Sequence, residues 1–182
     1  MTTTLRAGEA DAICGLLNRE LGADLYSPLG IGTDAISTRA HVRRIDDGGR
    51  VIAAAVSRLM ERGDADYYMA FGSEVRGLFR REPIGSFEAV AVDPGARRRG
   101  LATGLLEDAL SWFRSEGCAV GVAVSWLSGR EESSAGMFRR AGMVAGRVVA
   151  DFYLNDSIRD AWTCPVCAGP CHCAAQLFHR RF

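Results

Sequence analysis

The stretch FEAVAVDPGARRRGLATGLLEDALSWFRSEG, residues 87–117, combines the patterns of a strand, a tight turn and a long helix. FEAVAV is an apolar run typical of a buried strand, and VDPG ends it with a turn. From Arg97 to Ser115 apolar residues recur at helical spacing, and Gly117 is a stop signal. The apolar stripe consists of Leu101, Ala102, Leu105, Leu106, Ala109, Leu110 and Phe113. We therefore predict a strand followed at once by an amphipathic helix.

Three arginines, Arg97, Arg98 and Arg99, fall in the first turn of that predicted helix. The helix macrodipole makes cations unfavourable there. A bound polyanion would resolve the conflict, because unpaired first-turn N–H groups and guanidinium groups would converge on phosphate, with Gly100 allowing close approach. The alternative is an ordinary solvated helix start. The P-loop pattern GxxxxGK(S/T) and the full GxGxxG are absent, so neither of those nucleotide folds is supported.

The same stretch resembles the acyl-CoA-binding motif of the GNAT superfamily of N-acetyltransferases, in which (R/Q)xxGx(G/A) follows a strand ending in VxP. Arg97, Gly100 and Ala102 stand at the motif positions, after Val92 and Pro94. The resemblance implies an α/β (α+β) fold. It has a mixed, mostly antiparallel sheet of about six to seven strands, helices on both faces, and central strands that splay apart.

The segment SSAGMFRRAGM, residues 133–143, resembles the second motif of the family. Ser133 stands where the family usually has Asn, and Phe138 stands where it often has Tyr. The resemblance implies acetyl-CoA as cosubstrate, with its pantetheine arm between the strands that end at Val92 and near Trp126. The residues expected to bind it are Val90, Ala91, Val92, Arg97, Arg98, Arg99, Gly100, Leu101, Ala102, Thr103, Ser133 and Phe138.

The remaining patterns predict the other elements, although residues 62–85 give no clear pattern. Strands are expected at 2–7, 50–60, 86–92, 118–127, 146–154 and 174–182, and helices at 8–21, 32–49 and 131–143. We expect residues 1–182 to form a single domain, since hydrophobic residues make up 48% and charged residues 24%.

Charge and hydropathy narrow the class of partner. Basic and acidic residues both number 22, so no overall field favours nucleic acid or an acidic membrane surface. Neither a signal peptide nor an apolar run long enough for a membrane span is visible. We expect a cytoplasmic monomer or homodimer.

Glu88 interrupts the apolar strand FEAVAV, and a partly desolvated carboxylate there would have a raised pKa suited to a general base. A structural ion pair with an arginine of a neighbouring strand is the alternative. Backbone N–H groups near Ala91 or Val92 would hold the oxyanion. Phe138 cannot protonate the leaving thiolate, so water, Ser125, Ser133 or Tyr153 would do so.

Together these residues predict an N-acetyltransferase that moves acetyl from acetyl-CoA directly to a primary amine of a small molecule or peptide, with Glu88 and Ser133 as its catalytic residues. The alternative is a non-catalytic acyl-CoA-binding or zinc-stabilised interaction module, which Phe138 favours.

Four of the six cysteines lie in CPVCAGPCHC, residues 164–173, between the last two predicted strands. Their number fits a closed tetrahedral zinc site made by Cys164, Cys167, Cys171 and Cys173. The CxC pair would face the CxxC pair, because residues two apart on an extended strand share a face. An iron-sulfur run has different spacing, and a thioredoxin-like motif lacks its strand-to-helix context. Free thiols remain the alternative, and Cys14 and Cys118 are expected to be buried apolar residues.

Overall fold

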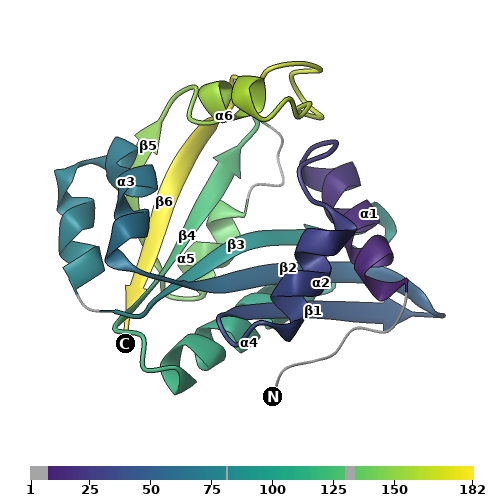
Figure 1. Ribbon diagram of the computed structural model, residues 1–182, viewed down its shortest axis with the longest axis horizontal. Helices are drawn as coiled ribbons and strands as arrows, with labels where there is room; N and C mark the ends of the chain where they lie inside the picture. The colour runs from purple at the N-terminus through teal and green to yellow at the C-terminus, as the bar shows by residue number, and fades with distance from the viewer. Residues whose placement is uncertain (1–7, 81, 130–133) are drawn as a thin grey trace.

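The computed structural model describes residues 8–80, 82–129 and 134–182. The strand expected at residues 2–7, and Ser133, lie outside the described residues. Six strands form one sheet in the order β1-β2-β3-β4-β6-β5, and β3 with β4 is its parallel pair (Figure 1). The mixed, mostly antiparallel sheet expected from the family resemblance is therefore confirmed.

The strands are β1 Ala40–Asp47, β2 Arg50–Met60, β3 Ile84–Val92, β4 Val120–Leu127, β5 Val144–Val149 and β6 Ala174–Arg181. The helices are α1 Glu9–Leu21, α2 Pro28–Ile36, α3 Ala65–Tyr68, α4 Leu101–Ser115, α5 Ala135–Arg140 and α6 Leu154–Arg159. Short 3-10 turns flank α3 at Arg62–Asp64, Met69–Phe71 and Ser73–Arg80, and another, Pro94–Ala96, follows β3.

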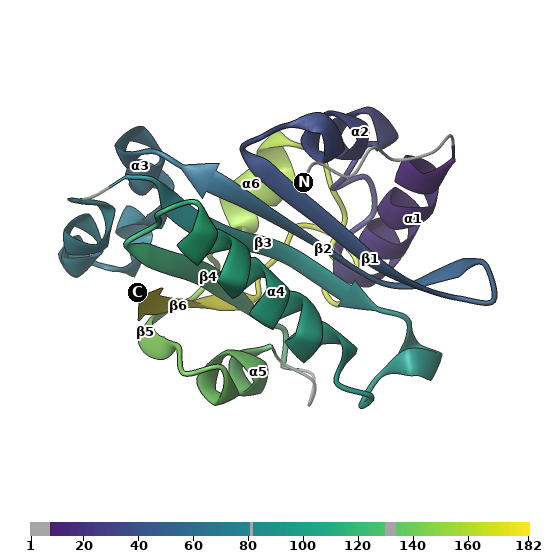
Figure 2. The same cartoon turned by 90° about the horizontal axis from the view of Figure 1, so that it is seen from below.

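Helices cover both faces of the sheet, as expected. On one face α4 and α5 pack against side chains of β2, β3, β4 and β6 (Figure 2). On the other, α1 and α2 cover β1 to β3, while α3 and its flanking turns cover the far ends of β3, β4 and β6. The alternation of side chains along each strand supplies both cores.

Close packing of α4 on the sheet depends on one glycine. A Cβ built on Gly85 of β3 would lie 2.2 Å from Cγ of Phe113, which is fully buried. Real Cβ atoms do not approach that closely, so only glycine lets α4 approach β3 here. This contact fixes the distance between the long helix and the central strand.

The helix expected at residues 32–49 is wrong from residue 37 onward. Ser27 caps α2, which ends at Ile36, and the chain then forms the edge strand β1. Gly48 and Gly49 both have positive φ and close a two-residue hairpin into β2, as type I′ turns do. The charged residues of β1 gave it a helical appearance. They find ion-pair partners instead, as Arg44 does with Glu9 at 2.7 Å.

The strand expected at residues 146–154 is displaced. β5 spans Val144–Val149, and after it Asp151 has a positive φ and turns the chain into α6. β5 and β6 are antiparallel neighbours, so the cysteine segment lies in the connection between the last two strands, as expected.

Candidate active site

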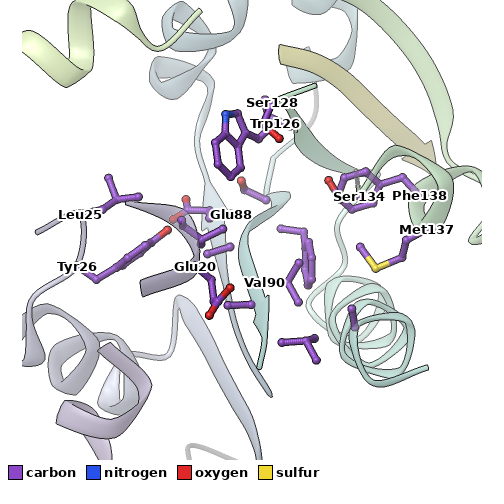
Figure 3. Close-up of a pocket in the computed structure, with 18 of the residues that line it drawn as sticks. Glu20, Leu25, Tyr26, Glu88, Val90, Trp126, Ser128, Ser134, Met137 and Phe138 are labelled. Carbon is purple, nitrogen blue, oxygen red and sulfur yellow. The ribbon is translucent and has the colours of Figure 1, made fainter. Parts of the chain in front are cut away.

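β3 and β4 separate soon after they pair. Three residue pairs join them, Gly85 with Gly121, Ser86 with Val122 and Phe87 with Ala123. Beyond these pairs a cleft of about 1950 Å³ is lined by residues 86–92 of β3 and by Val124 and Trp126 of β4 (Figure 3). Single small-molecule sites usually occupy about 300–1,000 Å³, so this cleft has room for more than one ligand.

The register of β3 determines which backbone groups face the gap. The Asp93 N–H donates to the Ile52 carbonyl at 2.8 Å, and Ala91 is paired with Ala54 of β2. In an antiparallel pair hydrogen-bonded residues alternate, so the polar backbone groups of Val90 and Val92 point away from β2, toward the gap. Those of Ala91 point toward β2. Of the donors expected near Ala91 or Val92, the register directs that of Val92 toward the gap and that of Ala91 toward β2.

The helix α4 begins at Leu101, so the three arginines precede its first turn rather than occupy it. Gly100 is the N-cap and has a left-handed φ of 78°, and Arg98 also has a positive φ. The sequence predicted a helix from Arg97, but the left-handed turn at Arg98 and Gly100 delays its start to Leu101. Arg98, Gly100, Leu101, Ala102 and Thr103 line the cleft. The first-turn N–H groups of α4 therefore lie at one end of it, which we call the α4 end.

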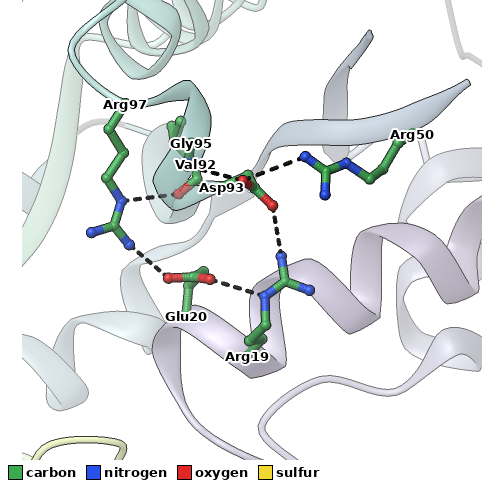
Figure 4. A network of polar contacts seen from close by, with 7 residues as sticks. All are labelled: Arg19, Glu20, Arg50, Val92, Asp93, Gly95 and Arg97. Atoms are coloured by element: carbon green, nitrogen blue, oxygen red, sulfur yellow. Dashed lines mark hydrogen bonds and ion pairs between the residues drawn. The ribbon is translucent and has the colours of Figure 1, made fainter. Parts of the chain in front are cut away.

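A polar network joins the loop before α4 to α1 (Figure 4). Arg97 donates from Nη2 to Glu20 at 2.7 Å and from Nε to the Val92 carbonyl at 3.2 Å. Asp93 accepts from the Gly95 N–H at 3.0 Å and pairs with Arg19 at 3.4 Å. Arg97 thus holds the loop in place from inside the cleft. The Val92 carbonyl accepts a hydrogen bond from Arg97, so it already has a partner within the protein.

Arg99 lies elsewhere. Its guanidinium is 4.0 Å from Asp47 at the end of β1, and it does not line the cleft. The three arginines therefore do not converge on one point. Arg98 is the one whose position matches the expected phosphate site most directly.

Glu88 stands at a β-bulge. Val56 pairs with Ala89 and Ser57 with Phe87, so Glu88 is the extra residue. Bulges of this kind re-aim a side chain and are frequent beside active sites. The side chain of Glu88 turns into the cleft and forms an ion pair with Arg58 of β2, which also pairs with Asp34 of α2 at 2.6 Å.

The surroundings of Glu88 raise its pKa above the ordinary value of 4.5, because burial by neighbouring protein outweighs the opposing charge of Arg58. Its side chain keeps 25% exposure. Tyr26 lies beside it in the cleft (Figure 3), and its pKa is raised by burial and then by the charge of Glu88. The ion pair and the raised pKa, which the sequence offered as alternatives, are both present.

Phe138 lines the cleft on α5, as expected for the residue at the family tyrosine position, and it is 2% exposed. Ser134, at the N-cap of α5, also lines the cleft and lies 2.9 Å from the hydroxyl of Ser125. Ser125 itself is fully buried. Among the described hydroxyl groups, Ser134 is the one that faces the gap close to Phe138.

The charges in the cleft are sorted by position. At the α4 end Arg97 and Arg98 outnumber Glu20, which pairs with Arg97, and Arg139 and Arg140 of α5 also line the cleft; its other part is lined by Asp64, Glu88, Asp156 and Asp160 beside Arg58. We call this other part the acidic end. Its walls include Tyr26, Tyr67, Tyr153, Trp126 and Trp162. Carboxylates next to aromatic faces favour a cation.

The four clustered cysteines meet as the sequence predicted. Their sulfur atoms all lie within 4.8 Å of one another, and Cys167 Sγ is 3.7 Å from Cys173 Sγ. A disulfide needs about 2.05 Å. Sulfurs bound to one zinc are roughly 3.8 Å apart, given tetrahedral Zn–S bonds of about 2.3 Å. The Cys167 N–H lies 3.4 Å from Cys164 Sγ, as in a tight metal-binding knuckle.

Sequence patterns missed several residues of the cleft. Arg58 was missed because its strand, RVIAAAVSRLM, was interpreted only as apolar. A charged residue inside that apolar run could have indicated a functional position. Tyr26 and Trp162 come from segments more than 130 residues apart, so no local pattern points to either. Cys14 and Cys118 are buried, as expected.

Residues 27–143 match the model of the acetyltransferase (GNAT) family. No protein of curated function matches the chain. No helix within the described ranges is long and apolar enough to cross a membrane.

Solved structures share the fold at low identity. Arabidopsis thaliana NAA60 in complex with acetyl-CoA gives a TM-score of 0.68 at 13% identity, with 98% of this chain and 96% of that chain covered. An agmatine N-acetyltransferase gives 0.66 at 15% identity, covering 98% and 97%. A NatC complex bound to Gag peptide and CoA gives 0.64 at 14%, covering 97% and 92%. Since the family match spans well over half of the sequence and the splayed sheet agrees with it, the chain belongs to the GNAT acetyltransferase family.

Proposed function

We propose that this acetyltransferase moves the acetyl group of acetyl-CoA directly to a primary amine of a small molecule or peptide. The sorting of charge in one continuous cleft carries the proposal. Arginines and the first-turn N–H groups of α4 suit the phosphates of CoA. The acidic end suits an acceptor that arrives as a cation, because a free alkyl amine has a pKa of about 10.

In the proposed reaction Glu88 takes a proton from the ammonium group, and the amine nitrogen attacks the thioester carbonyl. The new C–N bond forms and the C–S bond breaks. The N–H of Val90 or Val92, both directed into the gap, donates to the tetrahedral oxyanion. The second proton of the attacking nitrogen, lost as the amide forms, passes to the thiolate through the Ser134 hydroxyl or water, since Phe138 cannot relay a proton. Ser133, the other residue predicted to be catalytic, lies outside the described residues.

Acetyl-CoA titration tests the α4 end. Gly100→Glu should raise the Kd for acetyl-CoA about tenfold or more, equivalent to ~1.4 kcal/mol, because a carboxylate would face the phosphates. Gly117→Glu is the matched control, because Gly117 lies just beyond the other end of α4 with a similar φ of 75° and open space around it. Equal affinity in both variants, or no saturable binding by the wild type, would contradict the proposal.

An amine panel with CoA release as the readout tests transfer. Cationic amines should release CoA and acidic acceptors should not. If acetyl-CoA binds but no amine releases CoA, the chain is instead a non-catalytic acyl-CoA-binding module, the function that Phe138 favours.

We also propose that Cys164, Cys167, Cys171 and Cys173 hold a structural Zn²⁺. Four sulfurs at tetrahedral spacing, three of them buried, support a closed site with no position left for substrate. Elemental analysis of protein that has never contacted a nickel column should find one zinc per chain. Near-zero metal with four titratable thiols in the segment would rule zinc out.

A further inference from the structure

The cysteine cluster stands directly behind the acidic end of the cleft. Trp162 packs with Cys164, Cys171 and Cys173 in one buried cluster, and Trp126 and Tyr153 pack against it. All three aromatic residues also line the cleft, whereas the four cysteines do not. The cluster is therefore the support of a wall and not itself part of the surface that a substrate meets.

Hydrogen bonds connect two of the cysteines, Cys173 and Cys171, to elements that line the cleft. The Trp126 indole N–H donates to the sulfur of Cys173. The Cys171 N–H donates to the hydroxyl of Ser157 at 2.8 Å, which fixes α6 with Asp156 beside it. A change in the position of either cysteine would thus move a group that lines the acidic end.

The same segment reaches the N-terminal part of the chain. The Ala23 N–H donates to the Thr163 carbonyl at 3.2 Å in an isolated bridge, and a Cβ on Gly22 would lie 3.1 Å from the Trp162 ring. Residues 22–26 include Leu25 and Tyr26, which line another wall of the cleft. The segment around the cysteines therefore joins two walls of the acidic end.

Little regular structure holds this segment in place. Between α6 and β6 the backbone makes no helix or extended strand. Within the segment the Cys164 N–H donates to the Gly169 carbonyl at 3.1 Å and the Ala168 N–H donates to the Cys164 carbonyl at 2.9 Å. A bound ion contributes its binding energy to the folding of such a segment. The α4 end, in contrast, rests on a separate apolar core of α4, α5 and the sheet.

We propose that the metal-bound cysteine knuckle is the specificity-determining support of the acceptor site. Its occupancy positions Trp126, Tyr153 and Trp162, with the carboxylates of Asp156 and Asp160, to receive a cationic amine. The acetyl-CoA end does not depend on it. The proposal rests on the acetyl transfer and zinc site proposed above, and it assigns to the ion a role in choosing the acceptor as well as in stability.

Metal removal from the wild-type protein is the first test, with amide hydrogen exchange as the readout. Chelation should increase exchange far more in residues 22–27 and 150–163 than in α4, and the Kd for acetyl-CoA should change less than twofold. An equal increase throughout α4 and β3, or no increase in the two wall segments, would overturn the proposal.

Two variants separate the ion from the wall. Cys167→Ser removes the most exposed ligand and should reproduce the effect of chelation, whereas Cys118→Ser changes a buried cysteine outside the cluster and should not. Trp162→Ala should keep its zinc yet raise the KM for a cationic amine at least tenfold, with little change in kcat. An unchanged KM in Trp162→Ala would contradict the specificity role.

The outcomes distinguish this inference from its premises. Protein that contains no metal and shows four free thiols would end both the zinc proposal and this one. Protein that shows the expected exchange pattern but acetylates no amine would refute the proposed transfer while leaving the link between the ion and the wall established. Normal amine transfer with an acceptor KM unaffected by metal removal would refute this inference alone.

Discussion

Glu88 has a positively charged partner and still has a raised pKa. A carboxylate paired with arginine usually has a lowered pKa, but here burial contributes more than Arg58 does. The β-bulge explains both the ion pair and the raised pKa, because it turns Glu88 away from the regular strand pairing and into the cleft, where neighbouring protein surrounds its side chain. A carboxylate with a raised pKa accepts a proton more readily than an ordinary glutamate, which suits a general base.

Glu88→Gln should lower kcat/KM by roughly 10²–10⁴-fold, the usual contribution of a general base. Acetyl-CoA affinity should not change, because Glu88 lies away from the α4 end. Stopped-time assays of CoA release, with Glu107→Gln on the exposed face of α4 as control, measure the effect. Equal activity in the two variants would leave Glu88 as a structural ion-pair partner.

The pH dependence should have a matching sign. Glu88 must be ionised to act, so kcat/KM should rise with pH through an apparent pKa above 4.5, and Glu88→Gln should lack that limb. A raised carboxyl pKa in the folded state favours the neutral form. The stability it provides is complete below the unfolded pKa and is lost as pH rises through the folded pKa. At neutral pH Glu88→Gln should therefore not lower the melting temperature.

At the scale of elements, the contact between α4 and β3 determines the position of the helix N-terminus. Gly85→Ala should reduce the free energy of unfolding by roughly 1–3 kcal/mol, because the new methyl group would overlap the Phe113 ring. Gly104→Ala, at an open position in the first turn of α4, should instead stabilise by up to roughly 1 kcal/mol. Urea denaturation of both variants checks the opposite signs, and destabilisation by both would contradict the packing argument.

The elements that the sequence predicted well are those whose signal is local. β2, β3, β4 and α4 are long apolar runs or stripes, and the glycine and proline residues around them mark their ends. β1 was taken for a helix because its charged residues suppress the alternation of a strand. Its true signal, the Gly48-Gly49 hairpin, has the same composition as a helix stop. Only pairing with β2 decides between the two.

For the whole molecule, the bound ion should be part of the folding equilibrium. Withdrawing zinc from a thousand-fold excess over its Kd should lower the free energy of unfolding by about 4 kcal/mol. Thermal melts at several zinc concentrations measure this, and the wild type and Cys118→Ser should respond equally. A melting temperature independent of zinc would contradict a metal-stabilised fold.

The parts of the site that were predictable are those that single segments encode, which include Phe138 and the cysteine motif as well as the first family motif. Residues 87–103 contain Glu88, the gap-facing valines and the start of α4, and the family motif lies there. The rest of the acidic end is assembled from the loop after α1, from β2, from α3 with its turns, from β4, and from α6 with the residues after it, which come together only in the folded chain. Strand register places Arg58 beside Glu88, and the position of a loop places Tyr26 there. Neither can be deduced from the spacing of residues in the sequence.

The separation of β3 from β4 has a kinetic consequence. Because β3 and β4 separate beyond three residue pairs, one cleft includes both the α4 end and the acidic end, so two ligands can occupy it together. Neither ligand then has to leave before the other binds. The acetyl group can pass directly between them, so no acetylated enzyme needs to form. Initial-rate plots should intersect instead of running parallel, and CoA as product inhibitor should compete with acetyl-CoA but not with the amine.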